Sequence, residues 1–277
     1  MAMDLVIDLK CEPKTALGRG NADDGTRKLL SLVKARSQAA YVRHSAENDG
    51  RDPQTVSVKV VSILPDGSQT ARDVSLLQLE AEAAELDTIA SACATCPVNK
   101  GGRPAGCVGI VNYPVLASAE QWLMDRVQPP DSVGGFLMLS AIRDFKYTGE
   151  VTQGYRRRKL FEAATPVVRP LPENSFKAAA VSSDQLFHAL LGVGPKLNPW
   201  HLGMVLTWLG ALGVDGYVPN TPEQFDMLVK LTPEQRQERT QPNLGDPSPE
   251  PGPRSMQGLL YRMYVAWTHD LPMVVDA

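Results

Sequence analysis

The sequence lacks any hydrophobic run long enough to cross a bilayer. Its longest apolar stretch, GMVLTWLGALGV at 203–214, is shorter than the roughly 20 residues that a transmembrane helix needs, and it predicts a buried helix instead. The opening MAMDLVIDLK carries acidic residues early and lacks the basic start and apolar core of a secretory signal. We therefore expect a cytoplasmic protein with no membrane partner.

A basic excess is also missing. The formal net charge of the 277 residues is −3, whereas general nucleic-acid binders usually carry an excess of lysine and arginine. Hydrophobic residues make up 43% and charged residues 21% of the chain, which is typical of a globular protein with a well-buried core. The composition therefore argues against a general polyanion binder and leaves room for a local basic patch.

Motifs of hydrolytic and nucleotide-dependent enzymes are absent. No G-x-S-x-G elbow, H-E-x-x-H helix or P-loop occurs, and the glycines of GVGPKLNPWHLG at 192–203 lack the strand–turn–helix context of a dinucleotide site. The four histidines are scattered along the chain, at positions 44, 188, 201 and 269. These absences favour a non-enzymatic protein and leave enzyme activity open.

The first 115 residues alternate between strand and helix patterns. Strands are predicted where apolar residues alternate or run together, and helices where Leu, Ala and Glu recur at helical spacing. The expected strands are 3–9, 55–64, 69–75 and 107–113, and the expected helices are 26–46 and 75–92, with a PDGS turn at 65–68. This order is the βαββαβ pattern of ferredoxin-like domains, in which the first and last strands are neighbours in an antiparallel sheet.

The remainder of the chain predicts mostly helices. Capping residues precede apolar helical patterns at 118–127, 132–147, 182–194, 198–213, 221–231 and 255–269. The segment TQPNLGDPSPEPGP at 240–253 is too rich in proline, glycine and acids to bury a core, and it predicts a mobile surface loop. We therefore expect an α+β protein with a ferredoxin-like domain at 1–115 and a mostly helical region at 116–277.

Cysteine is scarce but clustered. Cys93, Cys96 and Cys107 fall within SACATCPVNKGGRPAGCVGIV at 91–111, and the fourth, Cys11, ends the first predicted strand. In a ferredoxin-like sheet the end of the first strand, the end of the second helix and the start of the last strand lie on one rim. The four thiols are therefore expected to meet there. Four sulfur ligands that include a Cys-x-x-Cys pair are typical of a zinc site, which is the preferred interpretation.

Three alternatives stay open for these thiols. Four sulfur ligands also suit an iron–sulfur cluster, although the spacing is not the tight run of bacterial ferredoxins. Cys93 and Cys96 could instead be a redox dithiol, but the pair follows a predicted helix, where the dipole opposes thiolate formation. Four unpaired buried cysteines are the remaining interpretation. A zinc site could also be purely structural.

A basic run, GYRRRKLF at 154–161, is the other candidate site. Arg156, Arg157, Arg158 and Lys159 follow one another beside Tyr155, and such cations could bind phosphate or stack on a base. Runs of this kind more often form a solvated face or pair with local acids.

The cysteine loop adds two more cations, Lys100 and Arg103, next to glycines that could complete an anion contact. From these features we expect an intracellular zinc protein that recognises another protein. Redox chemistry and nucleic-acid or nucleotide-phosphate binding are the alternatives, and the oligomeric state cannot be read from the sequence.

Overall fold

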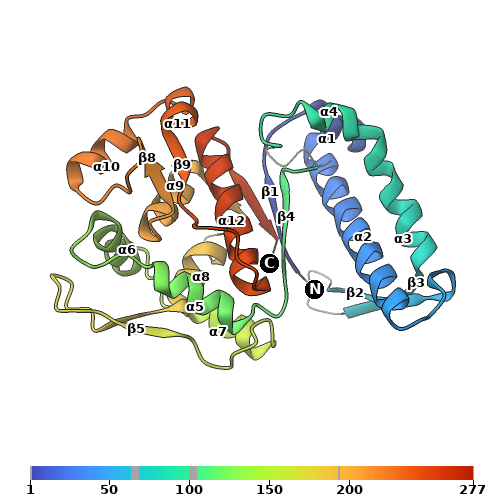
Figure 1. The fold of residues 1–277 in the computed structure, drawn as a ribbon, viewed down its shortest axis with the longest axis horizontal. Helices are drawn as coiled ribbons and strands as arrows, with labels where there is room; N and C mark the ends of the chain where they lie inside the picture. The colour runs from blue at the N-terminus through green and yellow to red at the C-terminus, as the bar shows by residue number, and fades with distance from the viewer. Residues whose placement is uncertain (1, 64–68, 100–104, 193, 277) are drawn as a thin grey trace. The chain divides into compact units, whose positions relative to one another are not determined.

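The computed structural model describes residues 2–63, 69–99, 105–192 and 194–276 (Figure 1). Of the chain, 53% is helical and 16% is strand, so the predicted α+β class is confirmed. The chain forms two compact units. We call residues 10–108 the insert unit, and residues 2–9 together with 109–277 the main unit. The PDGS turn predicted at 65–68 lies outside the described residues.

The main sheet has four antiparallel strands in the order β4-β1-β10-β7. These strands are β1 (Ala2–Ile7), β4 (Val108–Asn112), β7 (Lys196–Leu197) and β10 (Met273–Asp276). β1 pairs with β10 in a register that runs from Asp4 opposite Asp276 to Ile7 opposite Met273. Three successive side chains of β1 (Leu5, Val6 and Ile7) are at most 2% exposed, so both faces of this strand are covered.

The ferredoxin-like topology is not confirmed. The chain does follow the predicted order of strands and helices, and β1 and β4 are neighbours as expected. However, β2 (Ser57–Ile63) and β3 (Gln69–Ser75) pair with each other in a separate two-stranded sheet. On the side of β1 away from β4, the neighbouring strand is β10 rather than β2 or β3. Alternation within a segment predicts a strand but does not specify which sheet the strand joins.

This pairing also divides the chain differently from the predicted boundary at residue 115. The compact units separate between residues 108 and 109, and β1 belongs to the main unit because it is hydrogen-bonded into the same sheet as β10. The insert unit is therefore a single continuous segment between β1 and most of β4.

The insert unit is built on α2 (Ala22–Asn48) and α3 (Leu76–Ala83), with the shorter helices α1 (Glu12–Leu17), η1 (Pro53–Thr55), η2 (Ala84–Ile89) and α4 (Ala90–Ala94). Alanines keep the contact between α2 and α3 close, and their core includes Ala35, Ala39, Val42, Leu79 and Ala83. Asn21 caps α2 by accepting hydrogen bonds from the backbone of Asp23 and Asp24, and Ser75 forms a capping box with Gln78 at α3. An ion pair between Arg43 and Glu80 links the two helices, and Arg36 pairs with Asp87 of η2 at 2.7 Å.

The main unit holds the other helices. They are α5 (Ala117–Arg126), α6 (Val133–Asp144), α7 (Glu150–Arg157), α8 (Ser183–Leu191), α9 (Pro199–Trp208), α10 (Pro222–Val229), α11 (Pro233–Arg239) and α12 (Pro251–Thr268). Two small two-stranded sheets accompany them, β5 (Val168–Pro170) with β6 (Ala180–Ser182) and β8 (Leu212–Val214) with β9 (Thr240–Pro242). α12 packs against α5 and α9. Among the described residues, no helix is both long and apolar enough to span a membrane.

The segment predicted as a loop at 240–253 is partly regular. Its first three residues form β9 and its last three begin α12, so the predicted bounds are wrong at both ends. The residues between them are held by Gln257, whose amide donates to the carbonyl oxygens of Leu244 at 3.1 Å and Asp246 at 2.7 Å. The same side chain accepts from the backbone N–H of Ser248.

Candidate metal centre

All four cysteines line one small cavity, of about 30 Å³, in the insert unit. Cys11 is the extended residue that precedes α1, Cys93 lies in α4, Cys96 follows α4 in a turn, and Cys107 directly precedes β4. Cys93 and Cys107 are each 7% exposed, while Cys11 and Cys96 are half-buried. The adjacency of β1 and β4 brings Cys11 and Cys107 together even though the rest of the sheet differs from a ferredoxin-like one.

Backbone turns hold the Cys-x-x-Cys pair. The N–H of Cys96 donates to the carbonyl oxygen of Cys93 at 3.3 Å, and the N–H of Asn99 donates to that of Cys96 at 2.9 Å. The buried amide of Asn99 also donates to the carbonyl oxygen of Cys93 at 2.7 Å. Gly106 packs directly on this amide, because a Cβ at residue 106 would lie 2.0 Å from the Asn99 Oδ1. Asn99 is a supporting residue that the cysteine spacing alone does not reveal.

The surroundings of Cys107 favour its neutral thiol. Burial raises the pKa of the Cys107 thiol to about 11, and the other three cysteines add to the increase. Lys14 acts in the opposite direction and lowers the pKa of Cys107. The lysine side chain is only 1% exposed, so the insert unit buries a positive charge beside its thiols.

The four thiols do not form a ready ligand shell. Each is a free cysteine. Across the described ranges, no group of three or more cysteine, histidine or acidic side chains has the geometry to hold a metal ion. The set of donor atoms, all sulfur, nevertheless matches zinc or an iron–sulfur cluster. In the structure the four cysteines thus line one cavity, and metal binding stays a prediction.

The basic run does not form one exposed patch. Arg156 is buried, and only Arg157, Arg158 and Lys159 lie on the surface. The guanidinium of Arg158 stacks over the ring of Tyr155, with 4.8 Å between its carbon and the ring centroid. Lys100 and Arg103 lie outside the described residues.

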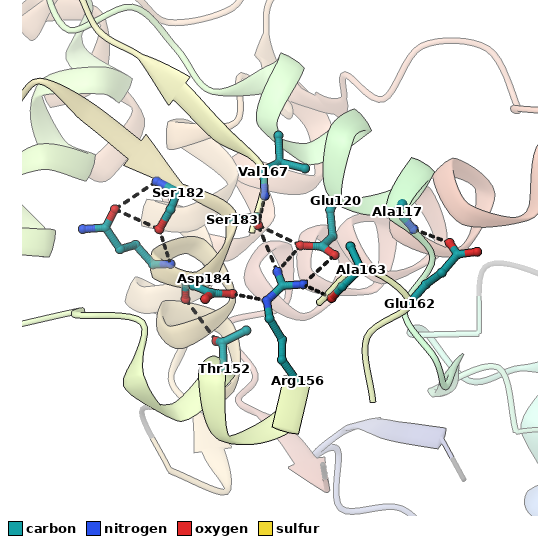
Figure 2. A network of polar contacts seen from close by, with 11 residues as sticks. Ala117, Glu120, Thr152, Arg156, Glu162, Ala163, Val167, Ser182, Ser183 and Asp184 are labelled. Carbon is teal, nitrogen blue, oxygen red and sulfur yellow. Dashed lines mark hydrogen bonds and ion pairs between the residues drawn. The ribbon is translucent and has the colours of Figure 1, made fainter. Parts of the chain in front are cut away.

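Arg156 is the centre of a buried polar network in the main unit (Figure 2). Its Nε donates to Asp184 Oδ1 at 2.7 Å, and its two terminal nitrogens donate to the two carboxylate oxygens of Glu120. Ser183 Oγ donates to Glu120 Oε2 at 2.7 Å and accepts from the N–H of Val167 at 3.1 Å. Both acidic side chains are at most 2% exposed. The network joins α5, α7 and α8, so Arg156 is a structural ion-pair residue.

Comparisons with known proteins found no matching family model, no similar curated protein and no similar solved structure.

Proposed function

We propose that this chain is a zinc protein in which Cys11, Cys93, Cys96 and Cys107 hold one Zn²⁺ ion. The observation that carries the proposal is that all the cysteines of the chain line a single cavity. A Zn²⁺ ion with four thiolates has a net charge of −2, and the buried Lys14 would offset part of that charge. Four protein ligands leave no open position for substrate, so the expected role of the ion is structural.

The cavity favours a single ion over a cluster. A volume of about 30 Å³ exceeds the roughly 10–15 Å³ that one water molecule needs, so the cavity has room for one metal ion. A four-iron cluster with its inorganic sulfides needs a larger space. The redox dithiol is disfavoured by position, because Cys93 lies near the C-terminal end of α4, where the helix dipole does not stabilise a thiolate.

The ion would close the insert unit at both of its ends. Cys11 and Cys107 each lie one residue inside the bounds of this unit, 10 and 108.

We further propose that the closed unit serves recognition of another protein. Its large exposed apolar side chains support this role, since Tyr41 on α2 is 74% exposed and Leu77 on α3 is 53% exposed. Measurable turnover that disappears in a folded Cys→Ser variant would contradict a recognition role.

Elemental analysis of the purified full-length chain tests the metal. We expect one zinc per chain, no visible colour, and loss of zinc in Cys96→Ser. Ala94→Ser is the matched control, because it adds the same hydroxyl group at an exposed position of the same segment and should keep the zinc. If the analysis finds iron together with sulfide, the site holds an iron–sulfur cluster instead of zinc. A chain that is metal-free after purification with zinc in the buffer would refute the site.

The pH dependence of stability provides a second test. In the zinc-free chain the pKa of the Cys107 thiol is raised from 9.0 to about 11. Below pH 9 this thiol is neutral in the folded and the unfolded chain, whereas between pH 9 and about 11 only the unfolded chain ionises. The free energy of unfolding should therefore fall by about 3 kcal/mol across this window.

Zinc should remove this decline between pH 9 and about 11, because the bound thiolates have already lost their protons in the folded chain. Urea denaturation at pH 8, 9, 10 and 11 measures how the free energy of unfolding depends on pH, with chelator for the zinc-free chain and with zinc for the loaded chain. A zinc-loaded chain that loses stability as steeply as the zinc-free chain would show that Cys107 is not a ligand.

A further inference from the structure

The main unit contains a second and much larger cavity, of about 500 Å³. Its lining comes from α6, α9, α10, α11 and α12 and from the segment that follows α6. This volume falls within the range of about 300–1,000 Å³ that is typical of sites for small organic ligands. The cavity lies in a different unit from the cysteines.

Aromatic side chains dominate the lining. They are Phe145, Tyr147, Trp200, Phe225 and Trp267, with the imidazole of His201 beside them. Phe145 is 62% exposed and Trp200 is 61% exposed although both line the cavity, so these rings lie where the cavity opens to solvent. Large exposed rings at an opening are typical of a site that a ligand covers, and ring edges and faces favour a planar aromatic ligand.

Among the lining residues that the structure describes, Arg236 alone is charged at neutral pH. Burial lowers the pKa of His201 below its usual value, which favours the neutral imidazole at pH 7, although the hydrogen bond from its Nε2–H to the carbonyl oxygen of Ala189 at 2.7 Å acts in the opposite direction. Arg236 is 6% exposed, and its Nη1 donates to the carbonyl oxygen of Trp267 at 3.0 Å and to Asp270 Oδ1 at 3.2 Å.

The other two nitrogens of Arg236 form no hydrogen bond with a residue that the structure describes. Its Nε is buried without a hydrogen-bond partner, and no bond from Nη2 occurs to any residue that the structure describes. The guanidinium also lies over the ring of Trp267, 4.9 Å from the centroid, and near that of Trp200, at 5.9 Å. A guanidinium with free donors at an aromatic wall suits a carboxylate attached to a ring.

We propose that this cavity binds a planar aromatic carboxylate, with its ring against Trp200 and Trp267 and its carboxylate accepting hydrogen bonds from Arg236. Arg236 carries one positive charge, so a monoanion is expected rather than a phosphate dianion. The ligand competes with Asp270 for the same guanidinium.

Calorimetric titration of the full-length chain tests the proposal. The probes are 2-naphthoic acid and 2-naphthalenemethanol, which share the ring and differ in charge. We expect the acid to bind at least tenfold more tightly. Asp270→Asn, at a 54% exposed side chain, should tighten acid binding severalfold by removing the competing carboxylate and should leave alcohol binding unchanged. Trp200→Ala should weaken both probes.

Arg236→Gln should abolish the difference between acid and alcohol. Arg239→Gln is the matched control, because Arg239 ends the same helix, is half-exposed and pairs with Asp215 away from the cavity lining. Equal affinities in the unmodified chain, or no binding of either probe at millimolar concentration, would overturn the proposal. If Arg236→Gln does not fold, the unmodified chain and Asp270→Asn still decide it.

Discussion

Replacement of Arg156 by methionine is expected to lower the free energy of unfolding by about 3–5 kcal/mol, the usual cost of removing one partner from a buried ion pair. The reason is desolvation. Glu120 and Asp184 are at most 2% exposed, and without the guanidinium both carboxylates would stay buried with little compensation. Urea denaturation followed by circular dichroism measures the change.

Arg158→Met is the matched control. It removes the same charge two residues away, but Arg158 is exposed and its guanidinium stacks on the ring of Tyr155. A change below about 0.5 kcal/mol is therefore expected. Adding Glu120→Gln to Arg156→Met should restore part of the lost stability, because a neutral amide is less costly to bury than a carboxylate. A loss below 1 kcal/mol for Arg156→Met would mean that water reaches these carboxylates.

Removal of the proposed zinc ion should have the second large effect. If the ion joins Cys11 to Cys107, it closes a loop of about a hundred residues, and a cross-link of that span restricts the unfolded chain by about 4–5 kcal/mol. Chelation, or Cys107→Ser, should therefore lower the unfolding temperature of the insert unit and leave that of the main unit in place. Differential scanning calorimetry with and without chelator measures the two transitions.

Ala94→Ser should behave like the unmodified chain in this experiment. Zinc added back after chelation should restore the original transition in the unmodified chain and not in Cys107→Ser. If chelation changes neither transition, the four thiols do not hold a stabilising ion. If it changes both to the same extent, the two units unfold together and the effect is not confined to the insert unit.

Local patterns predicted most of the secondary structure. Ser75, Ser132, Asn198 and Thr221 cap helices where the sequence placed caps, because capping depends on a few adjacent residues. Sheet membership depends on distant segments. β10 and β7 complete the main sheet, and no periodicity in the first 115 residues could reveal strands near 196 and 273.

The candidate sites divide in the same way. The cysteines meet because β1 and β4 are neighbours, which the predicted fold shares with the observed one. The burial of Arg156 was not predictable from its basic neighbours, since its partners Glu120 and Asp184 are 36 and 28 positions away in the sequence. The large cavity takes its lining from five helices, so no single motif marks it.

The pairing of β1 with β10 also constrains how the chain folds during its synthesis. β1 leaves the ribosome first, but its partner is translated only at residues 273–276. Until then one edge of β1, with its apolar Leu5, Val6 and Ile7, lacks its final neighbour. The insert unit, by contrast, is complete once residue 108 has emerged. Between the synthesis of residue 108 and that of residue 273, the nascent chain therefore carries a complete insert unit and a strand that still lacks its partner, and chaperones that bind apolar strands can act on it during that interval.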